Sequence, residues 1–341
     1  QVGGNTNISF TGGIIGTTGD GGATYGNIYG GGFGATADKL FGRIMGNTNV
    51  NISGGAILHN VYGGGAYSSV GTFNFSDGET GDMAYIPKGI PFDWEANTGV
   101  ATVNIKGGTI GISGRDNGMV NGSSRGEIAK PVPTVMWAMP DHHIDKDPYD
   151  KMAWVEQSIV NIGEDNTKGP HIKGSVYGGG ENGHVFTHAT VNVKSGTIGI
   201  VDEEDSWYDF GVQSINEAAW VTRGNVYGAG CGTDTYWDDK NSNGVVDDGD
   251  ELYNAWAGCV IGNTDVNISG GLIAQSVYGG GSMGSVGRLL EGADGRLRSR
   301  DDVSCDWYHF RVLRRQPAVP RAWRYGVRYE CGGHSAHHEV N

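Results

Sequence analysis

The 341-residue chain lacks features that would place it in several common classes of protein. It has no stretch of about 18 apolar residues, so it predicts no transmembrane helix and no direct membrane insertion. Basic residues are scarce: 24 Lys and Arg stand against 38 Asp and Glu, which gives a net charge of −14. Because contacts to phosphate require basic patches, we expect neither nucleic acid nor an anionic membrane as a partner.

Cysteine is also scarce, with four residues in the chain: Cys231, Cys259, Cys305 and Cys331. This number is too small for a disulfide framework in a chain of this length. Cys231 and Cys259 lie on either side of one insertion. The sequence therefore allows two alternatives, a disulfide bridge between them or two unpaired thiols. No HExxH motif is present, and no lysine follows the glycine-rich segments as a phosphate-binding loop would require.

Glycine is abundant instead, with 62 residues, and much of it belongs to a repeated phrase. A β-branched residue, a tyrosine and a glycine-rich corner occur together five times. The copies begin at Ile28, Val61, Val176, Val226 and Val277. A phrase repeated so faithfully is typical of an architecture of stacked repeats.

A second phrase alternates with the first, and its clearest copy is Val-Asn-Ile-Ser-Gly-Gly at residues 50–55. Further copies lie at residues 5–13, 101–108, 190–196 and 263–271, with a degenerate copy at 158–163. Apolar and polar residues alternate over five or six positions and a glycine corner follows. This pattern predicts a short strand with one buried face.

The two phrases together predict an all-β fold in which equivalent strands of successive coils stack as a parallel β-helix with long loop insertions. An antiparallel sandwich or barrel would require Asn-Gly or Asp-Gly hairpin turns, which are scarce. A propeller would require even blades of about 40 residues. The intervals between the tyrosines are 33, 115, 50 and 51 residues, which favours loops of different length inserted into one kind of coil.

We expect the coils to occupy residues 1–287, with insertions at about 76–97, 113–157, 202–222 and 231–258. Residues 288–341 differ in composition, because they contain ten arginines and no lysine and neither phrase occurs there. We interpret this atypical Arg-rich tail as a non-native, for example out-of-frame, or disordered extension. A genuine linker with a small tail is the alternative. We also interpret the whole chain as a fragment, without its signal peptide.

One insertion contains a candidate calcium loop at residues 239–250. Its oxygen-bearing residues, glycine and aliphatic residue have the spacing of a twelve-residue EF-hand-type loop, which surrounds Ca²⁺ with six to eight oxygens. The expected ligands are Asp239, Asn241, Asn243, the Val245 carbonyl, Asp247 and Asp250. Asp at the last position resembles the loops of dockerin-type modules. A structural Ca²⁺ that stiffens the insertion is expected, and a solvated acidic loop is the alternative.

The outward strand positions are mostly polar and carry few acids. They include Asn51, Asn104, Lys106, Asn192, Lys194 and Asn267. A glycoside-cleaving site requires paired carboxylates, and candidates lie only in the insertions. An enzyme would therefore require convergence of Asp82, Asp93, Asp141, His142 and Glu204.

Residues 1–287 resemble the glycine-rich β-helix repeat regions of large surface or secreted proteins of gut Bacteroidota and similar bacteria. The resemblance implies a right-handed, pectate-lyase-like solenoid that serves as an adhesin-like scaffold. It also implies an extracellular or cell-surface location, with glycans, extracellular matrix or cell-surface molecules as partners and no enzymatic activity. A carbohydrate-active β-helix enzyme, either a polysaccharide lyase or a glycoside hydrolase, is the alternative. A segment that only stacks end to end is a third reading.

Overall fold

The computed structural model describes residues 1–19, 24–35, 40–75, 91–112, 117–126, 152–200, 223–232, 236–238, 251–253, 257–287, 290–291 and 297–298. Every regular element in these residues is a strand, which confirms the all-β class. Three sheets of six strands each form the main body, and all pairings within them are parallel. This arrangement is compatible with a parallel β-helix.

The first sheet contains the long strands, which come from the second phrase. They are β1 (Thr6–Phe10), β6 (Thr48–Ile52), β11 (Val100–Ile105), β14 (Trp154–Ile162), β17 (His184–Val193) and β22 (Asn263–Ile268). The second sheet follows the glycine corner of that phrase. Its strands are β2 (Ile14–Ile15), β7 (Ala56–Ile57), β12 (Thr109–Ile110), β15 (His171–Ile172), β18 (Thr197–Ile198) and β23 (Leu272–Ile273).

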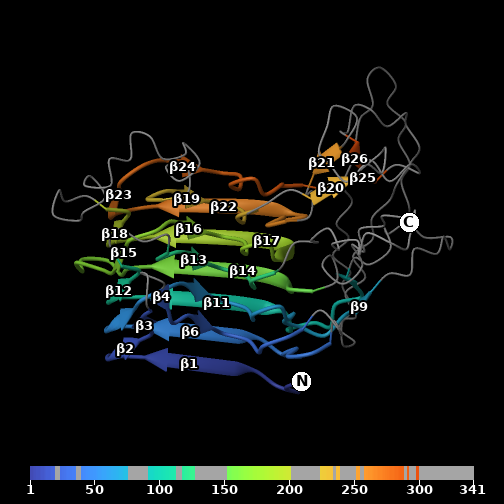
Figure 1. Ribbon diagram of the computed structural model, residues 1–341, viewed down its shortest axis with the longest axis horizontal. Coiled ribbons are helices and arrows are strands. Elements are labelled where there is room, and N and C mark those ends of the chain that lie inside the picture. The colour runs from blue at the N-terminus through green and yellow to red at the C-terminus, as the bar shows by residue number, and fades with distance from the viewer. Residues whose placement is uncertain are drawn as a thin grey trace, which may run out of the picture. The chain divides into compact units, whose positions relative to one another are not determined.

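The third sheet contains the tyrosine phrase. Its strands are β5 (Ile28–Tyr29), β8 (Val61–Tyr62), β13 (Val120–Asn121), β16 (Val176–Tyr177), β19 (Val226–Tyr227) and β24 (Val277–Tyr278). One strand of each sheet, taken in chain order, makes one coil, so that coil 1 is β1, β2 and β5 and coil 6 is β22, β23 and β24. The strands of the six coils lie one above another (Figure 1).

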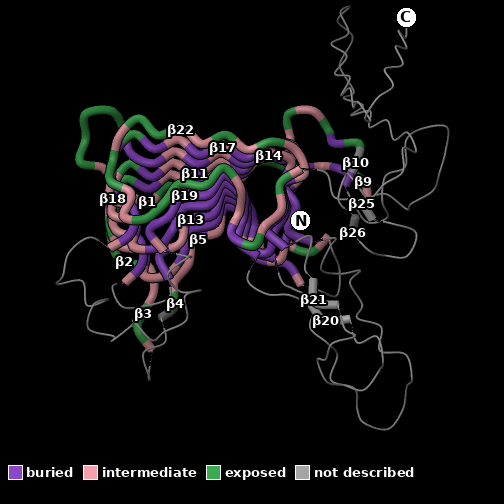
Figure 2. Tube along the Cα trace, turned by 90° about the horizontal axis from the view of Figure 1, so that it is seen from above, coloured by how far each residue is buried: buried purple, intermediate pink, exposed green. Residues whose placement is uncertain are grey.

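Equivalent residues of the phrases pair across the coils. Asn104 pairs with Asn51 on one side and Asn161 on the other, and Tyr29 pairs with Tyr62. The inward residues of all three sheets form one core, in which Val103, Val160 and other members are fully buried. Buried residues therefore run in continuous rows from coil to coil when the stack is viewed from above (Figure 2). Register follows from the pattern because a slip of one residue would turn each buried side chain outward.

The tyrosines of the third sheet form a column of stacked rings. The ring centroids of Tyr29 and Tyr62 lie 4.8 Å apart, and those of Tyr177 and Tyr227 lie 4.9 Å apart. Between Tyr62 and Tyr177 the position belongs to Asn121. The prediction that residues 113–157 form an insertion is thus wrong for residues 117–126, which belong to coil 3, and for residues 154–157, which belong to β14. The phrase went unrecognised there because its tyrosine and two of its glycines are replaced, giving Val-Asn-Gly-Ser-Ser.

In the described residues, four further strand pairs lie outside the three sheets, and all are antiparallel. They are β3 (Thr17–Thr18) with β4 (Thr24–Tyr25), β9 (Asn74–Phe75) with β10 (Pro91–Phe92), β20 (Tyr236–Asp238) with β21 (Glu251–Tyr253), and β25 (Leu290–Glu291) with β26 (Leu297–Arg298). The chain divides into two compact units, residues 1–72 with 97–288, and residues 73–96 with 289–341. The first unit holds all six coils. In the second, Phe73 packs on Trp94 with ring centroids 4.2 Å apart.

Candidate functional site

The outward face of the first sheet carries one row of asparagines. Side chains of a strand point alternately to its two faces, so the residues between the buried valines and isoleucines face outward. At one such position five successive coils have asparagine. The row consists of Asn51, Asn104, Asn161, Asn192 and Asn267. This asparagine row includes Asn161, whose phrase is degenerate in sequence.

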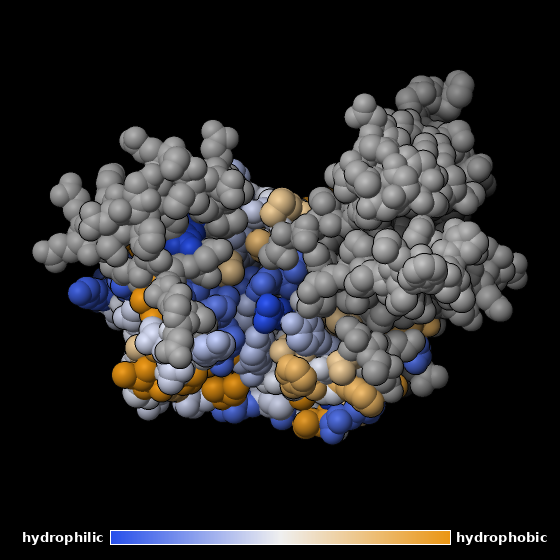
Figure 3. All heavy atoms as spheres, viewed as in Figure 1, coloured by the Kyte–Doolittle hydropathy of each residue, from blue (hydrophilic) through white to orange (hydrophobic). Residues whose placement is uncertain are grey.

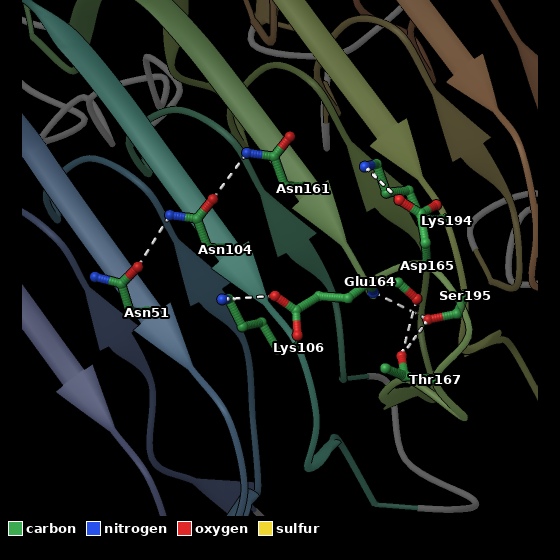
Figure 4. Close-up of polar contacts among 9 residues, drawn as sticks. All are labelled: Asn51, Asn104, Lys106, Asn161, Glu164, Asp165, Thr167, Lys194 and Ser195. Atoms are coloured by element: carbon green, nitrogen blue, oxygen red, sulfur yellow. Dashed lines mark hydrogen bonds and ion pairs between the residues drawn. The ribbon is translucent and has the colours of Figure 1, made fainter.

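Hydrogen bonds run along the asparagine row in one direction. Each side-chain amide donates from Nδ2 to the Oδ1 of the preceding coil, over 3.0 Å from Asn104 to Asn51 and 2.8 Å from Asn161 to Asn104 (Figure 4). The bonds from Asn192 and Asn267 continue the row at 2.9 and 3.0 Å.

In β1 the aligned residue is Ser9, so Asn51 donates instead to the neighbouring Asn7, over 3.1 Å. The hydrogen bonds therefore keep the same donor-to-acceptor direction as far as coil 1.

The row leaves hydrogen-bonding capacity that faces outward. A primary amide has two N–H donors and two acceptor lone pairs. An inner member such as Asn161 uses one donor and one acceptor within the row and is half-buried, so one donor and one lone pair stay available. The coils repeat at about 4.8 Å, and these groups therefore form a regular array.

Two ion pairs flank the asparagine row. Lys106 Nζ lies 2.6 Å from Glu164 Oε1, and Lys194 Nζ lies 3.1 Å from Asp165 Oδ2 (Figure 4). Both acids belong to the loop 163–169, which is held by hydrogen bonds to Ser195: the Glu164 amide donates to Ser195 Oγ over 3.1 Å. All four charged side chains are about half exposed or more, so each pair contributes little to stability.

The two acids beside the asparagine row belong to two separate ion pairs. Glu164 and Asp165 are each neutralised by their own lysine and do not share a site. Within the described residues, no three His, Cys, Asp or Glu side chains are placed to hold a metal ion. The outward face of the first sheet thus presents a row of neutral amides with two ion pairs beside it.

A second charged cluster lies beside the tyrosine column. The Tyr62 hydroxyl donates to Glu181, and Arg125 Nε lies 3.6 Å from the other Glu181 oxygen. Burial raises the pKa of Tyr62, and the Glu181 carboxylate raises it further, so that the hydroxyl remains a donor. The sequence patterns do not predict this cluster. A signal for it does exist in the sequence, because the residue that follows each glycine corner changes from coil to coil far more than the phrase does. These residues are Phe33, Ala66, Arg125, Glu181, Cys231 and Ser282.

The expected calcium loop lies outside the described residues. The same holds for all of its expected ligands, which are Asp239, Asn241, Asn243, Val245, Asp247 and Asp250. The strands on either side of it are described: β20 pairs with β21, and Asp238 lies opposite Glu251. The residues that precede and follow the loop, Asp238 and Glu251, are therefore close together. They are joined to a pair of strands, whereas an EF-hand has helices at these places.

The remaining expectations concern cysteines and acids. Cys231 and Cys259 are both buried and no disulfide joins them, so the bridge that the sequence allowed is absent. Asp82, Asp141, His142 and Glu204 lie outside the described residues. Asp93 is exposed, with its carboxylate 3.5 Å from Asn74 Nδ2. Convergence of the five groups thus remains a hypothesis.

The sequence also holds two matches to the G-x-S-x-G pattern, at residues 122–126 and 280–284. In serine hydrolases this pattern places the serine on a turn from a strand into a helix. Here both matches lie at glycine corners of the third sheet, and no helix follows within the described residues. Ser124 is buried and its Oγ accepts a hydrogen bond from the Gly65 amide, so these serines belong to the packing of the coils.

Comparison with known proteins gives no assignment: no protein-family model, no curated protein and no solved structure matches the chain. The described residues contain no helix with the length and hydropathy of a membrane span. The resemblance to bacterial surface repeats therefore stays a prediction.

Proposed function

We propose that this chain is a non-enzymatic, adhesin-like scaffold of a bacterial surface or secreted protein, built as a right-handed, pectate-lyase-like β-helix. The observation that carries this proposal is the unbroken row of outward amides across coils 2 to 6, with nearby acids held in separate ion pairs. Such a face presents hydrogen-bonding groups at a regular spacing without assembling a catalytic acid and base.

Glycans have the chemistry that fits this face. A sugar chain presents a series of hydroxyl groups, each able to donate and to accept. The second N–H and the second lone pair of inner asparagines such as Asn161 can bind such hydroxyls, and Lys106 and Lys194 add donors at the margin. We therefore propose an extended, polar glycan as the partner, bound along the stack.

Binding to a glycan array, followed by titration calorimetry with a retained glycan, tests the proposal. We expect the double variant Lys106→Ala and Lys194→Ala, and the single variant Asn161→Ala, to weaken binding several-fold. Lys168→Ala is the matched control, because Lys168 is an exposed lysine of the same loop outside both ion pairs. Equal affinity of all variants would exclude the asparagine face as the binding surface.

Incubation with polysaccharides separates the scaffold from the alternative of a carbohydrate-active enzyme. The scaffold is expected to bind without releasing reducing ends or unsaturated sugar products. Release of either, by wild type but not by variants of the acids in the insertions, would replace the proposal with a lyase or hydrolase.

We also propose that residues 239–250 bind one structural Ca²⁺. The spacing of the oxygen ligands and the pairing of β20 with β21 at the two ends of the loop support this. A chelator is expected to lower the melting temperature of the wild type, whereas Asp239→Ala and Asp250→Ala should already melt lower and no longer respond. Asp265→Ala, an exposed acid in β22, is the control that should respond like the wild type. An unresponsive wild type would contradict a calcium site.

A further inference from the structure

One buried column of the stack holds a different residue at the start of each of coils 2 to 6. Other columns repeat one kind of residue, such as valine in the core or the polar residues that make the middle of the long-strand face hydrophilic (Figure 3). The varied column precedes the short valine column that bridges the coils, which includes Val70, Val185 and Val260. All of its members are buried: Arg43, Ser69, Trp154, His184 and Cys259. Local departures from a pattern are expected at functional sites.

Two members of this column, His184 and Cys259, are in contact between neighbouring coils. Cys259 Sγ lies 3.6 Å from His184 Nδ1. His184 begins β17, and Cys259 precedes Val260, which bridges to Val185, so the backbone holds the two side chains in register. The indole of Trp154 packs on the imidazole with ring centroids 4.5 Å apart, which restrains the plane of the ring. Cys259 is fully buried and His184 is 2% exposed, so the pair lies away from water.

This burial limits the charge that the pair can hold, because an uncompensated charge inside a protein is costly. When a monovalent cation replaces the thiol proton of Cys259, the thiolate and the cation cancel and the imidazole stays neutral. A divalent cation would leave a net positive charge. Zinc also requires four ligands, and no three His, Cys, Asp or Glu side chains converge in the part of the chain that the structure describes. A thiolate with an imidazole suits a soft cation such as Cu(I), for which both are good ligands.

We propose that Cys259 and His184 bind one Cu(I) ion between coils 5 and 6, at a site separate from the asparagine row. The S–H bond of Cys259 breaks and its proton leaves to solvent, an S–Cu bond forms, and the Nδ1 lone pair of His184 completes the coordination without any change of oxidation state. Bond lengths like those of zinc, about 2.3 Å to sulfur and about 2.0 Å to nitrogen, give a linear S-to-N separation of about 4.3 Å. The two side chains therefore part only slightly from their contact distance of 3.6 Å.

Competition with a chromogenic Cu(I) chelator, with ascorbate present as reductant, tests the proposal. Every sample carries Cys305→Ser and Cys331→Ser, so that two thiols remain in the full chain. This parent is expected to take one equivalent of Cu(I) from the chelator. Adding Cys259→Ser or His184→Gln should abolish that uptake. Adding Cys231→Ser is the matched control: Cys231 is the other buried cysteine of the described residues, and its loss should leave uptake unchanged.

X-ray absorption at the copper edge identifies the ligands in the parent without relying on a substitution that could disturb folding. One sulfur and one nitrogen neighbour are expected. Two sulfur neighbours would overturn the proposal, because they would place the ion between Cys231 and Cys259. A parent that takes no Cu(I) from the chelator would overturn it too, as would full uptake by Cys259→Ser or by His184→Gln. Circular dichroism of each metal-free variant confirms that its strands are intact.

Discussion

At the scale of single residues, Asn121 is the exception in the tyrosine column. It is fully buried, and neither atom of its amide has a hydrogen-bond partner within the described part of the chain. Tyr62 and Tyr177, on the paired strands, are equally buried. A buried polar group without a partner costs about 1–3 kcal/mol. Asn121 is therefore a weak point in an otherwise regular core.

Asn121→Leu is expected to raise the free energy of unfolding by about 1–3 kcal/mol, because leucine has nearly the same shape and leaves no amide unpaired. Urea titration measures this change. Asn60→Leu is the matched control: its buried amide accepts from the Met119 amide over 2.9 Å and donates to the Tyr62 hydroxyl over 3.1 Å. That variant should be destabilised. A loss of stability in Asn121→Leu as large as in Asn60→Leu would contradict the reasoning.

The buried tyrosines also make stability depend on alkaline pH. Burial raises the pKa values of Tyr62 and Tyr177, and it raises that of Tyr227 to about 12. An unfolded tyrosine ionises near pH 10. Because the folded state holds the proton more tightly, this contribution is complete below about pH 10 and is lost as pH rises toward 12. We expect unfolding free energy to fall in this window, and less steeply in Tyr227→Phe; equal slopes would contradict this assignment.

At the scale of elements, glycine serves the two phrases for different reasons. After the second phrase, Gly55, Gly108 and Gly196 have positive φ, the region that favours glycine. After the tyrosine, φ is not positive, and the reason is close approach between coils. A Cβ on Gly63 would lie 2.2 Å from the Gly122 oxygen, and one on Gly122 would lie 2.2 Å from the Gly178 oxygen.

Gly122→Ala should therefore destabilise the protein by about 1–3 kcal/mol or more, because the added methyl forces two coils apart. Gly279→Ala is the matched control, since it has the same place in coil 6 and nothing lies within 4 Å of the added Cβ. Its effect should stay within about 0.5 kcal/mol. Denaturant unfolding compares the two, and equal losses would show that crowding by the next coil is not the cause.

At the scale of the whole molecule, each coil contacts only its neighbours, so stability is distributed along the stack. Inner coils have two neighbours, and Val103 and Val160 are fully buried there. Among the described strands, those of coil 6 have one neighbour, and Ile268 is 42% exposed.

Hydrogen exchange should consequently be slowest in β11 and β14 and fastest in β22, β23 and β24, because end coils open without breaking the rest. Mass spectrometry of peptides from each strand measures this gradient. Uniform protection across all six coils would contradict a stack that opens from its ends.

The sequence by itself determined the class of fold and, where the two phrases are clear, the strands and their register. Alternation and glycine corners are local properties, and identical phrases can bury their apolar side chains only by pairing with one another. Only the tertiary structure decided that Asn121 completes the tyrosine column and that Asn161 continues the asparagine row, because neighbouring coils impose these positions on degenerate copies of the phrases. It also placed Glu181 against Tyr62, 119 residues apart in the chain. Contacts between coils depend on which residues the stack brings together, and no pattern within one phrase contains that information.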